Sequence, residues 1–112
     1  MSEHLAQRFL RLLLETWGHR VHEASSGTEG LKIFSLTRPD IVFVDLGLPG
    51  VDGYAVAKAV RSEPGGAAIR LVAITGYGGD NDRRRSKDAG FDVHLTKPVS
   101  PDELTELLRM RD

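Results

Sequence analysis

Three polar residues each lie at the end of a predicted β-strand. They are Asp45 after residues 41–44, Thr75 after 71–74, and Lys97 after 92–96. The first two runs are continuously apolar, which is typical of short strands buried on both faces of a parallel sheet. Open α/β sheets bind their ligands at the carboxyl ends of the strands. The sequence therefore predicts that an acid, a hydroxyl and an ammonium group lie at one edge of the sheet.

Asp45 is the residue that packing explains least. Burying a carboxylate is costly unless it is paired, so an acid at the end of a buried strand points to chemistry. The turn that follows contains Gly47, Gly50 and Gly53, which allow the main chain to approach a ligand closely. The alternative is that Asp45 only caps this turn.

The composition fits a single domain. The chain has 112 residues, 40% of them hydrophobic and 28% charged, which is ordinary for a globular protein with one core. The net charge of −1 gives no electrostatic reason to expect nucleic-acid or membrane binding. The absence of cysteine excludes disulfides and thiolate metal sites, and fits a cytoplasmic protein.

Helices and strands alternate along the predicted secondary structure. Helices are expected at 2–17, 28–36, 53–62, from 80 or 81 to 89, and from 101 onward; strands are expected at 20–24, 41–45, 70–75 and 92–96. This order implies βαβ units, and hence a parallel sheet with helices on both faces. The sequence thus predicts an α/β fold with four recognisable strands and five helices.

Residues 44–53, Val-Asp-Leu-Gly-Leu-Pro-Gly-Val-Asp-Gly, resemble the phosphoacceptor loop of the receiver domains of two-component response regulators. Thr75-Gly76-Tyr77 and Lys97-Pro98 are similar to further motifs of that family. The resemblance extends from about Leu5 to the C-terminus. It implies that residues 1–112 are one receiver domain with a doubly wound, flavodoxin-like sheet.

The resemblance also implies a role for each strand-end residue. Asp45 would be the phosphoacceptor, Thr75 would donate a hydrogen bond to a phosphoryl oxygen, and Lys97 would place its charge on the phosphate. The peptide bond before Pro98 is expected to be cis. Thr75 and Lys97 also have simpler interpretations: Thr75 as a strand-end threonine chosen for its β propensity, and Lys97 as a solvated loop lysine.

Four other positions are interpreted through the same resemblance. His94 would be a switch side chain, or else a partly buried, hydrogen-bonded histidine. Gly47 and Tyr77 would tune the access of water to the phosphate, and Asp52 would form the turn into the next helix. The run of three arginines at 83–85 is either a solvated helix face or a surface that docks a partner.

One part of the family pattern is missing from the predicted elements. Receiver domains begin with an apolar strand that ends in two acids, and these acids hold Mg²⁺ together with the phosphoacceptor. Here Asp45 and the carbonyl of Gly47 would leave the magnesium site incomplete, and Glu3 is a weak substitute because an acid in a first helical turn is usually placed for the helix dipole. The expectation is an N-terminally truncated receiver domain, a second strand that slides into the empty position, or a sheet that another chain completes.

Two classes of function follow from these expectations. The first is a phosphoacceptor domain, not an enzyme beyond reactions on its own Asp45. It would receive a phosphoryl group from a sensor histidine kinase or a histidine phosphotransfer protein and switch a partner-binding surface. Direct contact with nucleic acid or a membrane is not expected, and a homodimer is left open. The second is a receiver-like interaction module that works without phosphorylation; a phosphatase or flavin-binding protein of similar topology is the weakest alternative.

Overall fold

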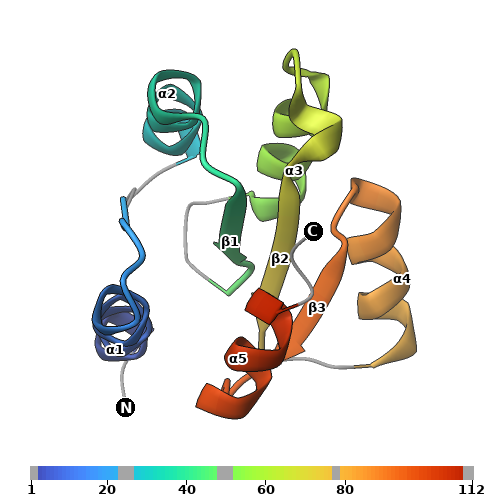
Figure 1. The fold of residues 1–112 in the computed structure, drawn as a ribbon. Coiled ribbons are helices and arrows are strands. Elements are labelled where there is room, and N and C mark those ends of the chain that lie inside the picture. Colours follow the sequence, from blue (N-terminus) through green and yellow to red (C-terminus); the bar gives the residue numbers. More distant parts are fainter. Residues whose placement is uncertain (1–2, 23–26, 48–51, 77–78, 110–112) are drawn as a thin grey trace. The chain divides into compact units, whose positions relative to one another are not determined.

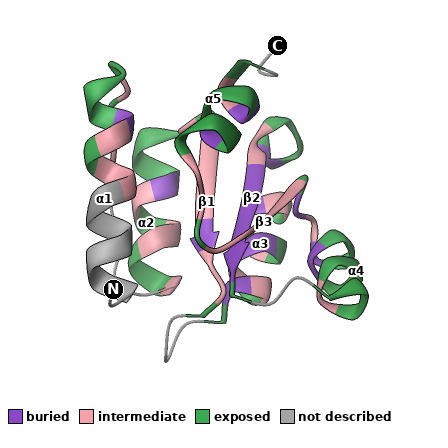
Figure 2. Ribbon diagram, turned by 90° about the horizontal axis from the view of Figure 1, so that it is seen from below, coloured by how far each residue is buried: buried purple, intermediate pink, exposed green. Residues whose placement is uncertain are grey.

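The central element is strand β2 (Arg70–Thr75), which is buried from Leu71 to Thr75. In the computed structural model it pairs in parallel with β1 (Ile41–Asp45) on one side and with β3 (Val93–Thr96) on the other. Figure 2 shows β2 in the colour of buried residues between its two neighbours. Because all three strands run the same way, their carboxyl ends meet at one edge of the sheet.

The structure describes residues 3–22, 27–47, 52–76 and 79–109, with side chains from residue 10 onward. The chain divides into two compact units. Residues 24–100 form the unit that contains the sheet, and residues 1–23 together with 101–112 form the other. Figure 1 shows the elements of both units.

Three α-helices belong to the unit with the sheet: α2 (Gly27–Thr37), α3 (Gly53–Ser62) and α4 (Asp80–Ala89). A short 3₁₀ turn, η1 (Gly66–Ala68), lies between α3 and β2. Helix α3 packs against α2, α4 and β1. Two successive right-handed crossovers that move along a sheet in one direction put their helices on the same face, which places α3 and α4 on one side of the strands.

The core of this unit lies between the helices and the sheet. Its buried residues are Phe34, Val44, Ala57, Val60, Leu71, Ala73, Ala89 and Phe91. Burying apolar area of this kind is the main favourable term in folding. The core therefore fixes β1 and β2, whose ends carry Asp45 and Thr75.

The second unit contains helices α1 (Glu3–Thr16) and α5 (Pro101–Arg109). Gly18 follows α1 with a φ of 90°, a left-handed backbone that glycine adopts easily. Leu104 and Leu107 are the buried residues of α5. Within the described part of the chain, every helix is too short or too polar to cross a bilayer.

Most predicted elements agree with the structure. The strands at 41–45 and 70–75 and the helix at 53–62 have the expected bounds, and the other helices begin and end within two residues of expectation. The last strand begins at Val93 rather than Asp92. Asp52 lies at the turn into α3 as expected, and it also caps this helix: its carboxylate accepts hydrogen bonds from the amides of Tyr54 and Ala55, each at 3.1 Å.

The predicted strand at 20–24 is wrong for its described residues. Residues 20–22 form neither helix nor strand, and residues 23 and 24 lie outside the described ranges. The segment Arg20-Val21-His22 has one apolar side chain and so no apolar face to bury, and a strand is marginal without a paired neighbour and such a face. The described residues therefore contain three strands, not four. The absence of the family's first, acid-ended strand stays a prediction.

Gly53 is held where β1 passes into α3, and we expect Gly53→Ala to destabilise the protein. A Cβ at this position would collide with the side-chain end of Leu46 and lie 2.9 Å from Cγ1 of Val44. Relieving such overpacking typically costs about 1–3 kcal/mol of the free energy of unfolding. Urea unfolding measures this loss.

The matched control is Ala55→Ser, an exposed position on the same helix. It should change the free energy of unfolding by less than about 0.5 kcal/mol. Equal stability of Gly53→Ala and the native chain would show that this junction is not tightly packed.

Candidate functional site

The carboxyl edge of the sheet brings Asp45 and Lys97 into direct contact. Lys97 Nζ lies 2.8 Å from Asp45 Oδ2, although the two residues are 52 positions apart in the chain. Asp45 ends β1 and Lys97 follows β3, so the lysine side chain reaches across the end of β2. Neighbouring strands lie roughly 5 Å apart, so the two side chains together bridge about two strand spacings, from β1 to β3.

The Asp45 carboxylate is almost enclosed. Its side chain is 8% exposed and that of Lys97 is 20% exposed. The second carboxylate oxygen, Oδ1, accepts a hydrogen bond of 2.8 Å from the amide of Gly47. Both oxygens therefore have a donor, as a buried carboxylate requires.

Gly47 lies directly against this ion pair. A Cβ at Gly47 would lie 3.4 Å from Asp45 Oδ1 and 3.8 Å from Lys97 Nζ. The glycine thus keeps the entrance to the carboxylate free of side-chain atoms. Pro49 and Gly50, which the sequence also places in this turn, and Tyr77 lie outside the described residues.

Thr75 ends β2, the strand that lies between β1 with Asp45 at its end and β3 with Lys97 after it. It is 5% exposed, and its carbonyl accepts a hydrogen bond of 2.8 Å from the amide of Lys97. Gly76 follows, and a Cβ there would meet no heavy atom of the described residues within 4 Å. The structure thus brings the three expected residues to one sheet edge. The Lys97–Pro98 peptide bond is cis, as the resemblance implies.

His94 lies on β3, paired with Ala73 in the sheet register rather than at the strand end. Its Nδ1 lies 3.0 Å from Oγ of Ser86, a residue of α4 that is 1% exposed. The hydrogen-bonded alternative for His94 is therefore confirmed, while its role as a switch stays a prediction. Ser86 gave no signal in the sequence, because a serine inside a polar helix looks exposed.

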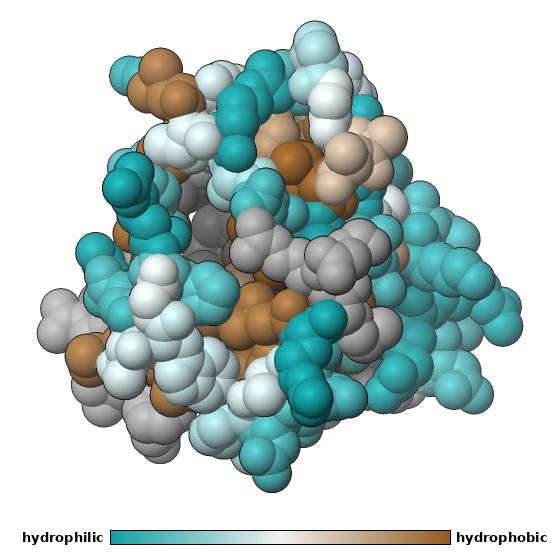
Figure 3. Space-filling view, in the orientation of Figure 1, coloured by the Kyte–Doolittle hydropathy of each residue, from teal (hydrophilic) through white to brown (hydrophobic). Residues whose placement is uncertain are grey.

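The three arginines of α4 are exposed, and Figure 3 shows hydrophilic surface over this helix. Arg85 also lies over the ring of Tyr54, with its guanidinium carbon 4.2 Å from the ring centroid. This cation–π contact joins α4 to α3. The basic run is thus a solvated face that includes one contact to the neighbouring helix; its use as a docking surface stays a prediction.

The described residues do not by themselves fit a magnesium site. Among the described His, Asp and Glu residues, no group of three or more could hold a metal ion. Asp45 would supply one carboxylate, whereas Mg²⁺ prefers about six oxygen ligands in octahedral geometry. The side chain of Glu3 lies outside the described part of the chain.

Several curated proteins resemble this chain. The regulator KdpE of Escherichia coli is 34% identical over 97% of the chain, and an uncharacterized 14.6 kDa protein of Leptolyngbya boryana is 34% identical over 89%. RpaA of Synechocystis, named a DNA-binding transcriptional regulator, is 33% identical over 86%. The chain spans 76% of the Leptolyngbya protein but only 47% of KdpE and 40% of RpaA. Such relatives give no support to the expectation that nucleic acid is not involved.

Solved structures show the same fold. A response regulator receiver domain from Methylobacillus flagellatus is 30% identical, with a TM-score of 0.81 over 96% of this chain and 90% of its own. The receiver domain of the sensor histidine kinase PA1611 from Pseudomonas aeruginosa is 25% identical, with a TM-score of 0.87 over 98% and 90%. That domain was crystallised with a magnesium ion in its active-site cleft. The likeness shows a flavodoxin-like α/β fold, here with a parallel sheet of three described strands.

We expect Lys97→Met to lower stability, because it would leave the enclosed carboxylate of Asp45 with the Gly47 amide as its one remaining donor among the described residues. An acceptor left without its partner typically costs about 1–3 kcal/mol, and a charged one more. Urea unfolding measures the change. Lys58→Met, at an exposed lysine of α3, is the matched control and should change the free energy by less than about 0.5 kcal/mol. Equal losses in both variants would mean that the Lys97–Asp45 contact does not form in solution.

One family matches nearly the whole chain. The match is to the response regulator receiver domain and covers residues 2–109. The fold, the acid at the end of β1 and the lysine beside it agree with that match. The chain therefore belongs to the response regulator receiver domain family of two-component signalling.

Proposed function

We propose that this chain accepts a phosphoryl group on Asp45 from a phosphohistidine of a sensor histidine kinase or a histidine phosphotransfer protein. The observation that supports this most is the 2.8 Å contact between Lys97 Nζ and Asp45 Oδ2 across the end of β2. It places a cation beside the only carboxylate at the carboxyl end of a strand in the described sheet. A cation there would stabilise the charge that a phosphoryl group brings.

The transfer exchanges a P–N bond for a P–O bond. A carboxylate oxygen of Asp45 attacks phosphorus, the new O–P bond forms as the N–P bond to the histidine breaks, and the leaving imidazole nitrogen keeps the electron pair. Lys97 Nζ then faces the phosphoryl oxygens as well as the carboxylate. The hydroxyl of Thr75 donates to one of these oxygens, and the lack of a side chain at Gly76 leaves room for the group.

The same event would act on a surface. His94 of β3 and Ser86 of α4 share a hydrogen bond. A movement of β3 near Thr75 would therefore also shift α4. Phosphorylation would shift the population between two arrangements of this strand and helix, and a partner would bind one of them better. The chain thus acts in cytoplasmic signalling, with reactions confined to its own Asp45.

The dependence of this phosphoryl transfer on magnesium is open to experiment. A bound Mg²⁺ would neutralise charge on the phosphoryl oxygens. Asp45 and the Gly47 carbonyl are the described groups that would contribute to holding it, and they do not complete a site.

A second function is favoured by one observation: both oxygens of Asp45 already have donors, the amide of Gly47 and Lys97 Nζ. This arrangement is also that of a structural ion pair, which keeps the strand ends together without further chemistry. In that case the chain would be an interaction module that works without phosphorylation. The experiment below separates the two functions.

Incubation with acetyl phosphate, with and without magnesium, tests the first function. Intact-mass spectrometry should show the gain of one phosphoryl group, and the label should be lost in hydroxylamine, which cleaves acyl phosphates. Asp45→Asn should abolish the gain, because an amide oxygen does not form a stable phosphoanhydride-like bond.

Asp52→Asn is the matched control. This exposed acid lies seven positions from Asp45, and asparagine keeps the oxygen that caps α3. Labelling should be unchanged in this variant. A native chain that is folded and takes no label under either magnesium condition would favour the interaction module instead.

A further inference from the structure

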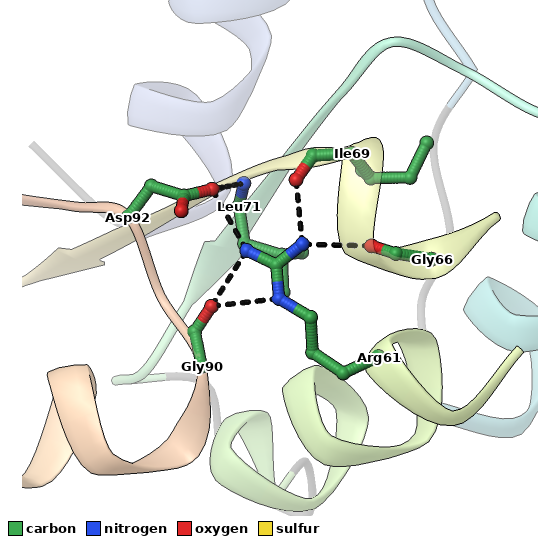
Figure 4. Close-up of polar contacts among 6 residues, drawn as sticks. All are labelled: Arg61, Gly66, Ile69, Leu71, Gly90 and Asp92. Carbon is green, nitrogen blue, oxygen red and sulfur yellow. Dashed lines mark hydrogen bonds and ion pairs between the residues drawn. The ribbon is translucent and has the colours of Figure 1, made fainter.

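Arg61 donates hydrogen bonds from all three guanidinium nitrogens at the edge of the sheet opposite to the candidate site. It belongs to the last turn of α3, and a guanidinium has five N–H donors. Nε and Nη2 donate to the carbonyl of Gly90 at 2.9 and 2.7 Å, and Nη1 donates to the carbonyls of Gly66 and Ile69 at 2.7 and 2.6 Å. Nη2 also contacts Asp92 Oδ2 at 2.8 Å. Figure 4 shows these five interactions converging on one planar group.

The acceptors come from the segments that enter two strands. Gly66 and Ile69 lie just before β2, while Gly90 and Asp92 lie just before β3. A single side chain therefore holds the amino ends of both strands. The side chain of Arg61 is 21% exposed, so these bonds form in a largely enclosed place where losing them is costly.

Asp92 carries the contact from Arg61 into the sheet. Its Oδ2 also accepts a hydrogen bond of 2.9 Å from the amide of Leu71, and its own amide donates to the Leu71 carbonyl at 2.8 Å. Leu71 is in β2 and Asp92 immediately precedes β3. Three hydrogen bonds of Asp92, one to Arg61 and two to Leu71, therefore fix the first pairing between these two strands.

The last rung between the same strands holds Lys97. Its amide donates to the Thr75 carbonyl at 2.8 Å, and β3 has only four residues between Asp92 and Lys97. One residue of a strand spans roughly 3.3 Å and alternates in face, so a slip of one residue would move the Lys97 side chain away from Asp45 and turn it to the other face. The register at the Asp92 end thus decides whether the 2.8 Å contact of Lys97 with Asp45 can form.

We propose that Arg61 is a positioning residue for Lys97: it fixes the register of β3 against β2 and thereby places the lysine at the carboxylate of Asp45. This rests on the proposed function only where phosphorylation is the readout. The contrasting interpretation is that Arg61 adds stability to the whole unit and has no particular effect on Lys97.

Amide hydrogen exchange of Arg61→Lys, measured by NMR on the full chain, separates these interpretations. Lysine has three donors on one nitrogen and does not match acceptors spread around a planar fork. Exchange at the Lys97 amide should accelerate at least about tenfold more than exchange at the Leu46 amide, because one hydrogen bond of the β2–β3 ladder weakens selectively. The Leu46 amide bonds to Ile74 in the β1–β2 ladder and is the internal reference. Equal acceleration at both amides would overturn the proposal.

A double-mutant cycle gives the functional readout. Arg61→Lys should slow acetyl phosphate labelling about tenfold in the native chain and leave the residual rate of Lys97→Met unchanged, because the effect acts through Lys97. The same fold loss in both backgrounds would overturn the proposal. A native chain that takes no label would end the proposed function, and the exchange measurement would still decide the role of Arg61.

Two further variants keep the test decisive. Arg38→Lys is the matched control, since Arg38 also binds a carbonyl, that of Pro64 at 2.9 Å, but at the end of α2. It should leave the ratio of Lys97 to Leu46 exchange unchanged. If Arg61→Lys does not fold, Asp92→Asn replaces it, because asparagine keeps an oxygen for the Leu71 amide and loses the charge that pairs with Arg61. Asp92→Asn should also accelerate exchange selectively at Lys97, and an unchanged ratio there would overturn the proposal.

Discussion

The ion pair between Lys97 and Asp45 is the interaction on which the candidate site depends. It joins the first and third strands of the described sheet across the end of the second. An enclosed carboxylate needs donors, and the two that it has come from the turn after its own strand and from the residue after β3. Any change in how the strands are aligned therefore changes the charge balance at Asp45.

The burial of β2 explains why this alignment is kept. Its residues from Leu71 to Ile74 are at most 6% exposed, with helices α3 and α4 covering one face of the sheet. A strand with both faces enclosed has little freedom to slip, because a shift of one residue exchanges the two faces. The hydrophobic core thus acts on the site indirectly, by fixing the strand that lies between the acid and the lysine.

Much of this arrangement could be predicted from the sequence, because its signals are local. The apolar runs ending at Asp45 and Thr75 gave the strand bounds, and Asp52 was recognisable as part of the turn into α3. The strand prediction at 20–22 was wrong because one apolar residue among polar neighbours does not define a buried face.

The contacts that tie distant segments together were not predictable. Arg61 meets Asp92 across 31 positions, and no spacing rule connects an arginine at a helix end with an acid before a strand. The partner of His94 was missed for a similar reason, since Ser86 alone has an ordinary surface interpretation. Long-range polar contacts of this kind depend on the packed fold, and one sequence without a structure does not reveal them.

Helix α4 differs from the other helices of its unit, because its only buried residues are the small Ser86 and Ala89. Little apolar area therefore holds this helix to the sheet, and most of its other residues are exposed. Mutations on that outward face have small energetic consequences for folding. Recognition of a new partner could consequently evolve on α4 by successive surface substitutions, with the packed interior left as it is.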